Sequence, residues 1–366
     1  MKPLQVADCK PVWIVCLVAS AIGACLAAKS ASASDDADLL KDARSLFQPL
    51  PKDMATAEFP VTPGRVLLGR MLFFDPRISA DGTGSCVRCH QPALYGADGL
   101  PKSVGVHDKP LPRNSPTVFN AGLYTSEHWD GRFANVEEQA KRALLGPGFG
   151  NPDFPTAMAR VKAIPGYGAM FQQAFPGEAD PVSEDNWGKA IGAYERTLVS
   201  PSRFDDYLAG KSDALSAAER KGLRTFIDTG CVECHKGSGL GGLGFRKFGV
   251  VSDYWPLTGS HDIDKGRFVL TNEPADLYKF KVAGLRNVAM TPPYFHDGAV
   301  DTLPKAVHIM AKVQLDDDLS DQEVNEIVTF LGSLTGTLPE GFERAPVLPA
   351  GGFRPPTSAS PHPQTK

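Results

Sequence analysis

The sequence predicts a mainly α-helical protein with two similar domains in tandem, connected by long loops. Helix start signals precede apolar residues at helical spacing in both halves of the 366-residue chain, whereas the alternation typical of strands is scarce. A short cysteine pattern also occurs twice, once in each half. The composition, 42% hydrophobic and 22% charged, is that of a globular protein and excludes a polytopic membrane protein.

Start and stop signals define the expected helices. In the first half, Thr62 followed by proline predicts the start of a helix, and Pro76 after an aspartate predicts its end. In the second half, segments 216–219 and 320–323 have the Ser-x-x-Glu form of a capping box, each followed by an apolar stripe. The last helix is expected to end at Gly336.

Residues 1–33 have the features of an export signal. Lysines precede an uncharged apolar run at 12–28, which is shorter than the ~20 residues of a membrane-spanning helix, and small residues at 31–33 form a cleavage site. One alternative is a lipoprotein signal that would leave a lipid anchor on Cys25. Another is a short buried segment of the folded protein. The signal pattern predicts an exported protein.

The remaining chain is expected to form two domains and a tail. The predicted boundaries are residues 34–200, 201–338 and 339–366, and the last segment is rich in proline, glycine and serine. This tail is expected to be disordered or to pack along the surface. With 38 basic and 42 acidic side chains the formal charge is −4, so nucleic acid is excluded as a partner.

Four of the seven cysteines form two copies of one motif. The copies read Cys86-Val-Arg-Cys89-His90 and Cys231-Val-Glu-Cys234-His235. Two thiols at this spacing can add to the two vinyl groups of one haem, and the adjacent histidine then reaches the iron. The alternatives are two redox dithiols, chance, or a zinc site of four cysteines, which would leave both histidines without a role. The pattern therefore favours two covalently bound haem c groups.

The residues themselves leave the sixth ligand of each iron open. Spacing does not choose among the remaining histidines and methionines. A methionine thioether would raise the reduction potential, a second histidine would leave it lower, and an open position would permit reaction with a small oxidant.

Seven segments, taken together, resemble the bacterial di-haem cytochrome c peroxidases, whose superfamily includes the methylamine-dehydrogenase maturation enzyme. They occur in the family's order over about residues 60–336. The segments are Leu68–Arg77, Cys86–His90, Pro112–Thr117, Trp129–Arg132, Cys231–His235, Leu285–Asn287 and Pro293–Gly298.

The resemblance implies roles for further residues. It makes His107 the distal histidine of the N-terminal, peroxide-reacting haem, and this ligand dissociates in the family when the other haem is reduced. It makes Met310 the axial ligand of the C-terminal, high-potential haem, where the maturation branch has a tyrosine. Trp129 matches the tryptophan between the haems, for which a plain core aromatic is the alternative.

The resemblance also implies a calcium ion between the domains. Asn114, Thr291 and Pro293 match the positions that supply its oxygen ligands. Amide and backbone carbonyl oxygens suit such a hard cation.

The sequence departs from the family in the catalytic loop. Gln139 matches a family position ten residues after the tryptophan, but Phe149 stands where the family has a distal glutamate. Asp153 is the candidate to replace that glutamate in moving a proton between the peroxide oxygens. The alternative is that Asp153 is only a turn residue after a proline.

The implied function is a periplasmic peroxidase that reduces hydrogen peroxide to water. A small donor protein, a cytochrome c or a cupredoxin, would supply the electrons, and the family is usually homodimeric. Because the glutamate is missing, two alternatives stay open: a di-haem electron-transfer protein, and a di-haem oxidase of a protein or organic substrate.

Overall fold

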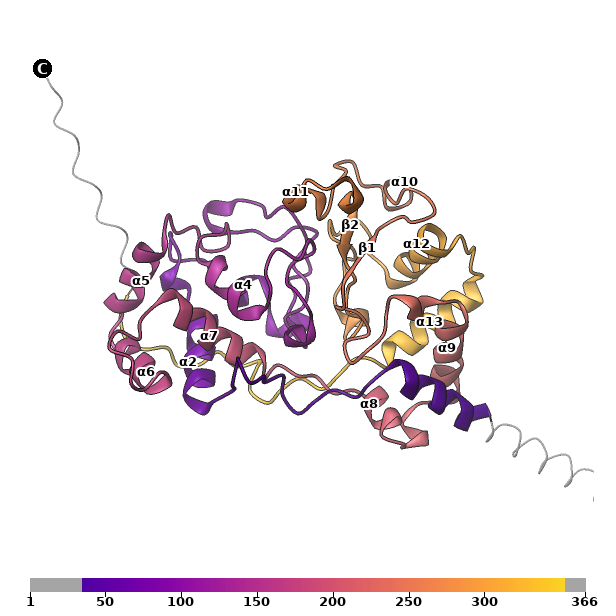
Figure 1. Cartoon of the computed structure of the whole chain (residues 1–366), viewed down its shortest axis with the longest axis horizontal. Coiled ribbons are helices and arrows are strands. Elements are labelled where there is room, and N and C mark those ends of the chain that lie inside the picture. Colours follow the sequence, from indigo (N-terminus) through magenta and orange to yellow (C-terminus); the bar gives the residue numbers. More distant parts are fainter. Residues whose placement is uncertain (1–34, 353–366) are drawn as a thin grey trace, which may run out of the picture. The chain divides into compact units, whose positions relative to one another are not determined.

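The computed structural model describes residues 35–352 (Figure 1). The chain divides into two units, residues 1–45 and 46–366, and the described part of the first is helical. All elements below belong to the second. The predicted export signal and Cys25 lie outside the described residues. No helix within the described range is both long and apolar enough to cross a lipid bilayer.

Helices dominate the regular structure of the second unit, so the prediction of a mainly helical fold is confirmed. The two strands, β1 (Phe245–Lys247) and β2 (Lys279–Lys281), pair antiparallel with Arg246 opposite Phe280. The α-helices are α2 (Pro63–Phe74), α3 (Cys86–Cys89), α4 (Val136–Ala143), α5 (Phe154–Ala163), α6 (Tyr167–Ala174), α7 (Glu184–Glu195), α8 (Arg203–Leu208), α9 (Ala217–Asp228), α10 (Trp255–Thr258), α11 (Phe268–Thr271), α12 (Leu303–Leu315) and α13 (Asp321–Gly332).

Helices α2 to α7 form one packed set, called here the N-terminal group (Figure 1). Helix α2 starts and ends where the sequence predicted. At its start, the Thr62 side chain accepts a hydrogen bond from a backbone N–H of the first turn. It crosses α7 at Gly69, where a Cβ atom would lie 1.9 Å from the Ala190 carbonyl oxygen. A second glycine, Gly188 of α7, permits the same closeness to α4. The helices therefore touch backbone to backbone around a core of aromatic and aliphatic side chains.

Helices α9 to α13 with the two strands form the C-terminal group. Both predicted capping boxes are present, at Ser216 before α9 and at Ser320 before α13. The two helices cross at Gly222, whose added Cβ would lie 2.0 Å from the Glu326 carbonyl oxygen. The α2–α7 crossing has the same feature, so each group is built on a glycine-mediated helix pair.

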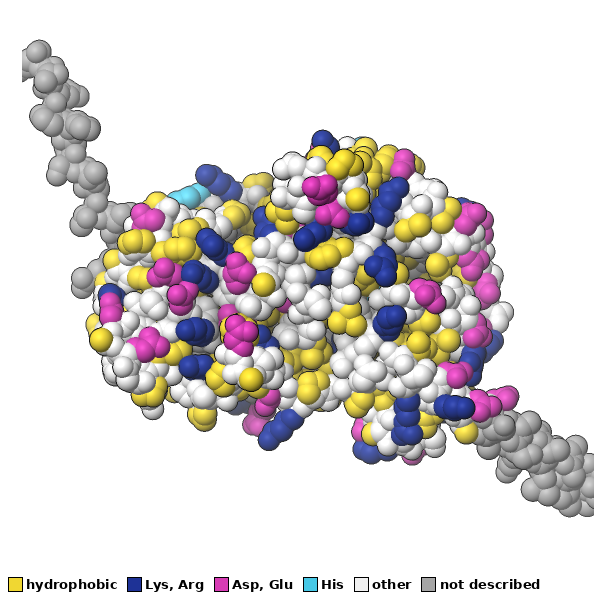
Figure 2. Space-filling view, viewed as in Figure 1, with side chains coloured by type: hydrophobic (Ala, Val, Ile, Leu, Met, Phe, Trp, Pro, Cys, Tyr) yellow, Lys and Arg dark blue, Asp and Glu magenta, His cyan; other side chains and the backbone are white. Residues whose placement is uncertain are grey.

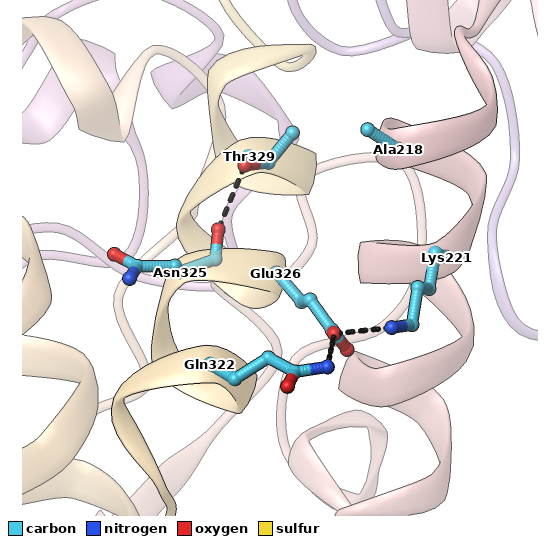
Figure 3. Close-up of a pocket in the computed structure, with 6 residues that line it drawn as sticks. All are labelled: Ala218, Lys221, Gln322, Asn325, Glu326 and Thr329. Atoms are coloured by element: carbon cyan, nitrogen blue, oxygen red, sulfur yellow. Dashed lines mark hydrogen bonds and ion pairs between the residues drawn. The ribbon is translucent and has the colours of Figure 1, made fainter.

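A groove runs over the α9–α13 crossing (Figure 3). Glu326 reaches across it to Lys221 at 2.6 Å and also accepts a hydrogen bond from Gln322 at 2.8 Å. The Lys221 hydrogen bond is the largest cause that lowers the pKa of Glu326, to about 2. Because these polar side chains satisfy one another, the groove reflects helix packing. Its lining is Ala218, Lys221, Gln322, Asn325, Glu326 and Thr329.

Helix α13 ends at Gly332, not at Gly336 as predicted. The reason is that the backbone after Gly332 forms hydrogen bonds with Asn287 instead of continuing the helix. The Leu334 carbonyl accepts a hydrogen bond from the Asn287 N–H, and the Gly336 N–H donates to Asn287 Oδ1 at 2.8 Å. These bonds draw the chain away from the helix axis.

Residues 339–352 lie against the N-terminal group. Phe342 is buried in its core, with its ring centroid 4.8 Å from that of Phe119. Arg70 of α2 donates to the carbonyl oxygens of Gly341 and Arg344, each at 2.7 Å. This stretch, assigned to a tail from the sequence, thus packs on the fold up to the last described residue.

A buried hydroxyl helps to join the two groups. Asn120 and Asn287 each donate a side-chain N–H to Ser200 Oγ at 2.8 Å. Both asparagines have the same left-handed backbone, φ 61° and ψ 10°, and each precedes a short 3₁₀ helix. Gly336 completes the junction, because a Cβ there would lie 2.1 Å from the Ser200 carbonyl oxygen. We call Asn120, Ser200 and Asn287 the clamp.

An Asp-Gly turn follows each clamp asparagine and meets the opposite group. A Cβ on Gly131 would lie 2.1 Å from the Phe245 ring of β1. A Cβ on Gly298 would lie 2.4 Å from the Pro101 Cα atom. Both glycines have positive φ, so the turns need glycine for conformation as well as for space.

We predict opposite effects for alanine at two glycines. Gly222→Ala should lower the free energy of unfolding by about 1–3 kcal/mol, because the methyl group forces α9 and α13 apart. Gly332→Ala, at a position with open space around it, should raise that free energy by about 0.4–1 kcal/mol. Thermal unfolding followed by circular dichroism measures both. Equal effects of the two substitutions would contradict the proposed crossing.

Candidate active site

The first cysteine motif lies on α3, directly before a tight loop. Its histidine, His90, ends the helix, and its Nδ1 atom lies 3.0 Å from the Gly96 carbonyl oxygen. Burial lowers the pKa of His90, so the ring is neutral near pH 7 and Nδ1 carries the proton of this bond. Nε2 is then the nitrogen with a free lone pair, the arrangement expected of a metal-binding histidine.

The second motif repeats this arrangement on a short 3₁₀ helix, Cys231–Glu233. His235 Nδ1 lies 3.1 Å from the Leu240 carbonyl oxygen, and burial again lowers the pKa of the histidine. Thr229 Oγ1 lies 3.3 Å from the sulfur of Cys231. Both histidines are therefore held in the same tautomer by a backbone carbonyl a few residues downstream.

The four cysteines fit covalent haem better than the alternatives. All four are free thiols, which excludes a disulfide in either motif. Within residues 35–352, no three His, Cys, Asp or Glu side chains are grouped closely enough to hold a metal ion, so a zinc ion shared by the cysteines has no support. Burial raises the pKa of Cys86, Cys89 and Cys231, which keeps these thiols protonated. Two free thiols beside an oriented histidine are what thioether attachment of a haem requires.

His107 lies on an exposed loop, in the 3₁₀ helix Val106–Asp108, with a left-handed φ of 55°. Its backbone N–H donates to Asp81 Oδ2 at 2.8 Å, and its ring Nδ1 lies 3.6 Å from the same oxygen. Partial burial would raise the pKa of Asp81, but bonds from His107 and Thr83 lower it to about 2. The His107 side chain is 58% exposed. The loop therefore presents this histidine at the surface, beside a carboxylate.

Trp129 is fixed from both groups. Its indole N–H donates to the Asn114 carbonyl oxygen at 2.9 Å, and its own carbonyl oxygen accepts from the Lys281 N–H at 2.7 Å. Lys281 belongs to β2 of the C-terminal group, and its ammonium group bonds to the carbonyl oxygen of Ser126 and the carboxylate of Glu127. The tryptophan thus lies where the N-terminal loop meets the C-terminal sheet.

Gln139 lies on α4, with its Nε2 atom 3.5 Å from His128 Nε2. His128 directly precedes Trp129, so the predicted site residues Gln139 and Trp129 are neighbours. Phe149 lies on the loop after α4, which touches the His107 loop because the Val106 N–H donates to the Pro147 carbonyl oxygen at 3.0 Å. The His107 loop therefore touches the loop that follows α4, and Gln139 of α4 lies beside the residue before Trp129.

The structure does not bring Asp153 to this set. Asp153 is the exposed N-cap of α5, where Oδ1 accepts the Thr156 N–H at 2.7 Å. Hydrogen bonds from the Thr156 side chain and then from its backbone N–H lower the pKa of Asp153. Phe149, at the position of the family's glutamate, is buried with its ring edge toward Trp187 at 5.9 Å. An apolar core residue thus occupies the place of the expected acid.

Met310 lies half-buried on α12, which packs against α13, and α13 in turn packs against α9, the helix before Cys231. Asn114 connects to the loop that holds Thr291 and Pro293, because its N–H donates to the His296 carbonyl oxygen at 2.8 Å. The predicted calcium ligands therefore come from loops joined by a hydrogen bond.

The sequence prediction missed His296. Its ring centroid lies 6.4 Å from that of Trp129, edge to face, and the residue is buried. The signal was present as a weak internal repeat: Asn120 lies nine residues before Trp129, and Asn287 nine residues before His296, with Asp-Gly following both rings. Aligning the two Asp-Gly turns would have identified His296 as the counterpart of Trp129.

The chain is similar to known proteins of one family. A profile of the di-haem cytochrome c peroxidases matches residues 63–213. The chain is 44% identical to cytochrome c551 peroxidase of Pseudomonas aeruginosa over 319 residues, 86% of this chain and 91% of that protein. It is 32% identical to the methylamine utilization protein MauG of Methylorubrum extorquens, over 88% of this chain and 92% of that protein.

Solved structures show the same fold. A MauG-like protein associated with microbial copper homeostasis has a TM-score of 0.68 at 28% identity, over 78% of this chain and 93% of that one. The di-haem peroxidase BthA from Burkholderia thailandensis has a TM-score of 0.63 at 20% identity, over 83% of this chain and 94% of that one. On the sequence relationship, supported by this fold, the chain belongs to the di-haem cytochrome c peroxidases, oxidoreductases that act on peroxide.

Proposed function

We propose that the protein is a periplasmic peroxidase that reduces hydrogen peroxide to water with electrons from a small donor protein, a cytochrome c or a cupredoxin. The observation that carries this proposal is the anchoring of Trp129 by Asn114 on one side and Lys281 on the other, between two motifs with the same histidine geometry. Family membership implies two haems. The proposed haem domains are residues 34–200 and 201–338.

Each motif holds one haem. When bound, the two haems accept single electrons and deliver them to peroxide. The thiols form the thioether links, and the fixed tautomer of each histidine presents Nε2 to the iron. The proposed set is Cys86, Cys89 and His90 for the first haem, and Cys231, Cys234, His235 and Met310 for the second.

Trp129 carries electrons between the two groups. Its carbonyl oxygen and indole N–H are both bonded, so the ring cannot rotate without breaking a partly buried hydrogen bond. A rigid aromatic ring at the junction shortens the gap that an electron must cross.

His107 acts as a withdrawable ligand of the first haem. Exposure of its side chain and its bonds to Asp81 support a loop with two positions, one at the iron and one at the surface. Gln139 and the neighbouring His128 supply polar groups for peroxide. The sequence leaves two interpretations of Asp153 open: a residue that moves a proton, or a turn residue after a proline. Its hydrogen bond to the first turn of its own helix supports the second interpretation.

A calcium ion bound by Asn114, Thr291 and Pro293 would stabilise the junction, since Asn114 also holds the Trp129 indole. Calorimetric titration of chelator-treated protein with calcium tests this site. Absence of any binding heat would remove it from the mechanism.

Export, oligomeric state and donor charge are also proposals. Covalent haem suits a protein sent to the periplasm, because the cofactor cannot dissociate there. The proposed dimer rests on the family resemblance and is tested by light scattering.

The net charge of −4 alone would favour a basic donor. Figure 2 shows basic and acidic side chains interspersed over the visible face, so the net charge alone does not locate a docking surface. The salt dependence of donor-driven turnover reports this electrostatic contribution.

Spectra and turnover of the half-reduced protein test the function itself. In the presence of calcium, the half-reduced form should lose one axial ligand of the first haem and then consume peroxide with a reduced donor. A half-reduced form that keeps six ligands and shows no turnover would contradict the peroxidase.

Met310→His should lower the reduction potential of the second haem. An imidazole stabilises ferric iron more than a thioether does, so we expect a fall on the order of 100 mV within the ~0.8 V that axial ligands span. A spectroscopic redox titration measures it. Met170→Leu, on α6, is the control and should leave both potentials unchanged. An unchanged potential in Met310→His would show that Met310 is not the ligand.

Asp153→Asn should leave peroxide turnover close to that of the parent protein. Asparagine caps a helix as well as aspartate does, and it cannot carry a proton. Asp153→Ala should lower the thermal stability slightly with little change in turnover. A strong loss of turnover in both variants, with the fold intact, would instead assign proton transfer to Asp153.

A further inference from the structure

A row of aromatic rings leads from Trp129 to the protein surface. The ring centroids are 6.4 Å apart from Trp129 to His296, 5.4 Å from His296 to Tyr254, and 5.3 Å from Tyr254 to Trp255. Tyr278 follows at 5.2 Å from Trp255. The row begins at the junction and runs through the C-terminal group alone.

Burial varies along the row. Trp129 at its start is partly exposed, His296 is 2% exposed and Tyr254 is fully buried, and Trp255 and Tyr278 are again partly exposed. The two middle rings are therefore shielded from water, and the last two reach it.

The inner rings are held rigidly by stacking. The His296 ring lies against Phe280 with centroids 4.2 Å apart, and the Tyr254 ring lies against Phe248 at 4.4 Å and an interplanar angle of 10°. One residue also fixes the start of the row: Asn114 accepts the Trp129 indole N–H and donates its own N–H to the His296 carbonyl oxygen. The spacing of the first rings is thus set by packing and by hydrogen bonds.

The chemistry of the row is that of electron donation. Tryptophan and tyrosine are the aromatic side chains most easily oxidised by one electron, and electronic coupling between rings decays exponentially with distance. The Tyr254 hydroxyl lies 3.4 Å from His296 Nε2. Burial, with Asp264 and Asp297 nearby, raises the pKa of Tyr254, so this phenol is protonated at neutral pH. Trp255 can release its indole proton to water.

We propose that the row forms an electron-donating branch made of His296, Tyr254, Trp255 and Tyr278. When the donor protein is scarce, this branch returns an electron to oxidised Trp129, and the oxidising equivalent moves to Trp255 at the surface. The branch rests on the proposed role of Trp129 as the electron bridge. Its function is protective: a solvent-exposed tryptophan is oxidised in place of the residues around the first haem.

The electrons and protons of the step balance. Cleavage of the peroxide O–O bond to give two waters takes two electrons and two protons. One electron comes from the reduced donor protein and one from Trp255. One proton comes from solvent and the other from the Trp255 indole N–H, which leaves a neutral Trp255 radical. The next electron from the donor, with a proton from solvent, restores the indole.

The test uses the full-length protein with both haems bound. It is mixed with excess hydrogen peroxide and a limiting amount of ascorbate as the reductant, then freeze-quenched for electron paramagnetic resonance and digested for peptide mass mapping. We expect a tryptophan radical, and oxygen addition concentrated at Trp255. Tyr254→Phe keeps the ring but is much harder to oxidise. It should reduce oxygen addition at Trp255 by about an order of magnitude and leave turnover at saturating donor unchanged.

Tyr207→Phe, at a buried tyrosine of α8 outside the row, is the matched control and should leave Trp255 oxidation as in the parent protein. Equal oxidation of Trp255 in Tyr254→Phe and in the parent would overturn the branch while leaving the bridge intact. Normal donor-driven turnover in Trp129→Phe would overturn the bridge itself. The two failures are therefore distinguishable.

Discussion

The clamp at Ser200 is the interaction on which the arrangement of the site depends. One buried hydroxyl oxygen accepts hydrogen bonds from Asn120 and Asn287, which begin equivalent loops of the two groups. A neutral hydrogen bond contributes about 1 kcal/mol net, whereas a buried amide without a partner costs about 1–3 kcal/mol. Separating the two loops would leave the buried asparagine amides without a partner. This free-energy cost holds the loops together more than the net contribution of either hydrogen bond does.

This constraint sets the position of the proposed electron path. Nine residues beyond each clamp asparagine lies an aromatic ring, Trp129 in one loop and His296 in the other, and the two rings meet edge to face. Asn114 then links both rings through its backbone. The clamp, Asn114 and the two Asp-Gly turns together register the N-terminal loop against the C-terminal sheet, and this registration holds Trp129 in the position that the proposed bridge requires.

Local signals in the sequence predicted the helices well, because caps act over a few residues. Ser216 and Thr62, for example, cap the helices that follow them. The Cys-x-x-Cys-His spacing, on which the proposed haem attachment sites rest, is a local signal of the same kind. The same reasoning misplaced the end of the last helix and missed His296, because both depend on partners far away in the chain. Burial of Phe342 against Phe119 is a third contact of this kind. The departure at Phe149 was visible in the sequence, but only the fold shows that Asp153 is a helix cap.

The rate of electron transfer between the two haems in Ser200→Ala tests the central claim most directly. This substitution removes the oxygen shared by both asparagines and no group of the electron path. Ser333→Ala, which removes another buried hydroxyl of the C-terminal group, is the control. The account predicts a rate about an order of magnitude lower in Ser200→Ala, with haem content and both reduction potentials unchanged. An unchanged rate in a correctly folded Ser200→Ala protein would contradict the claim that the clamp positions the bridge.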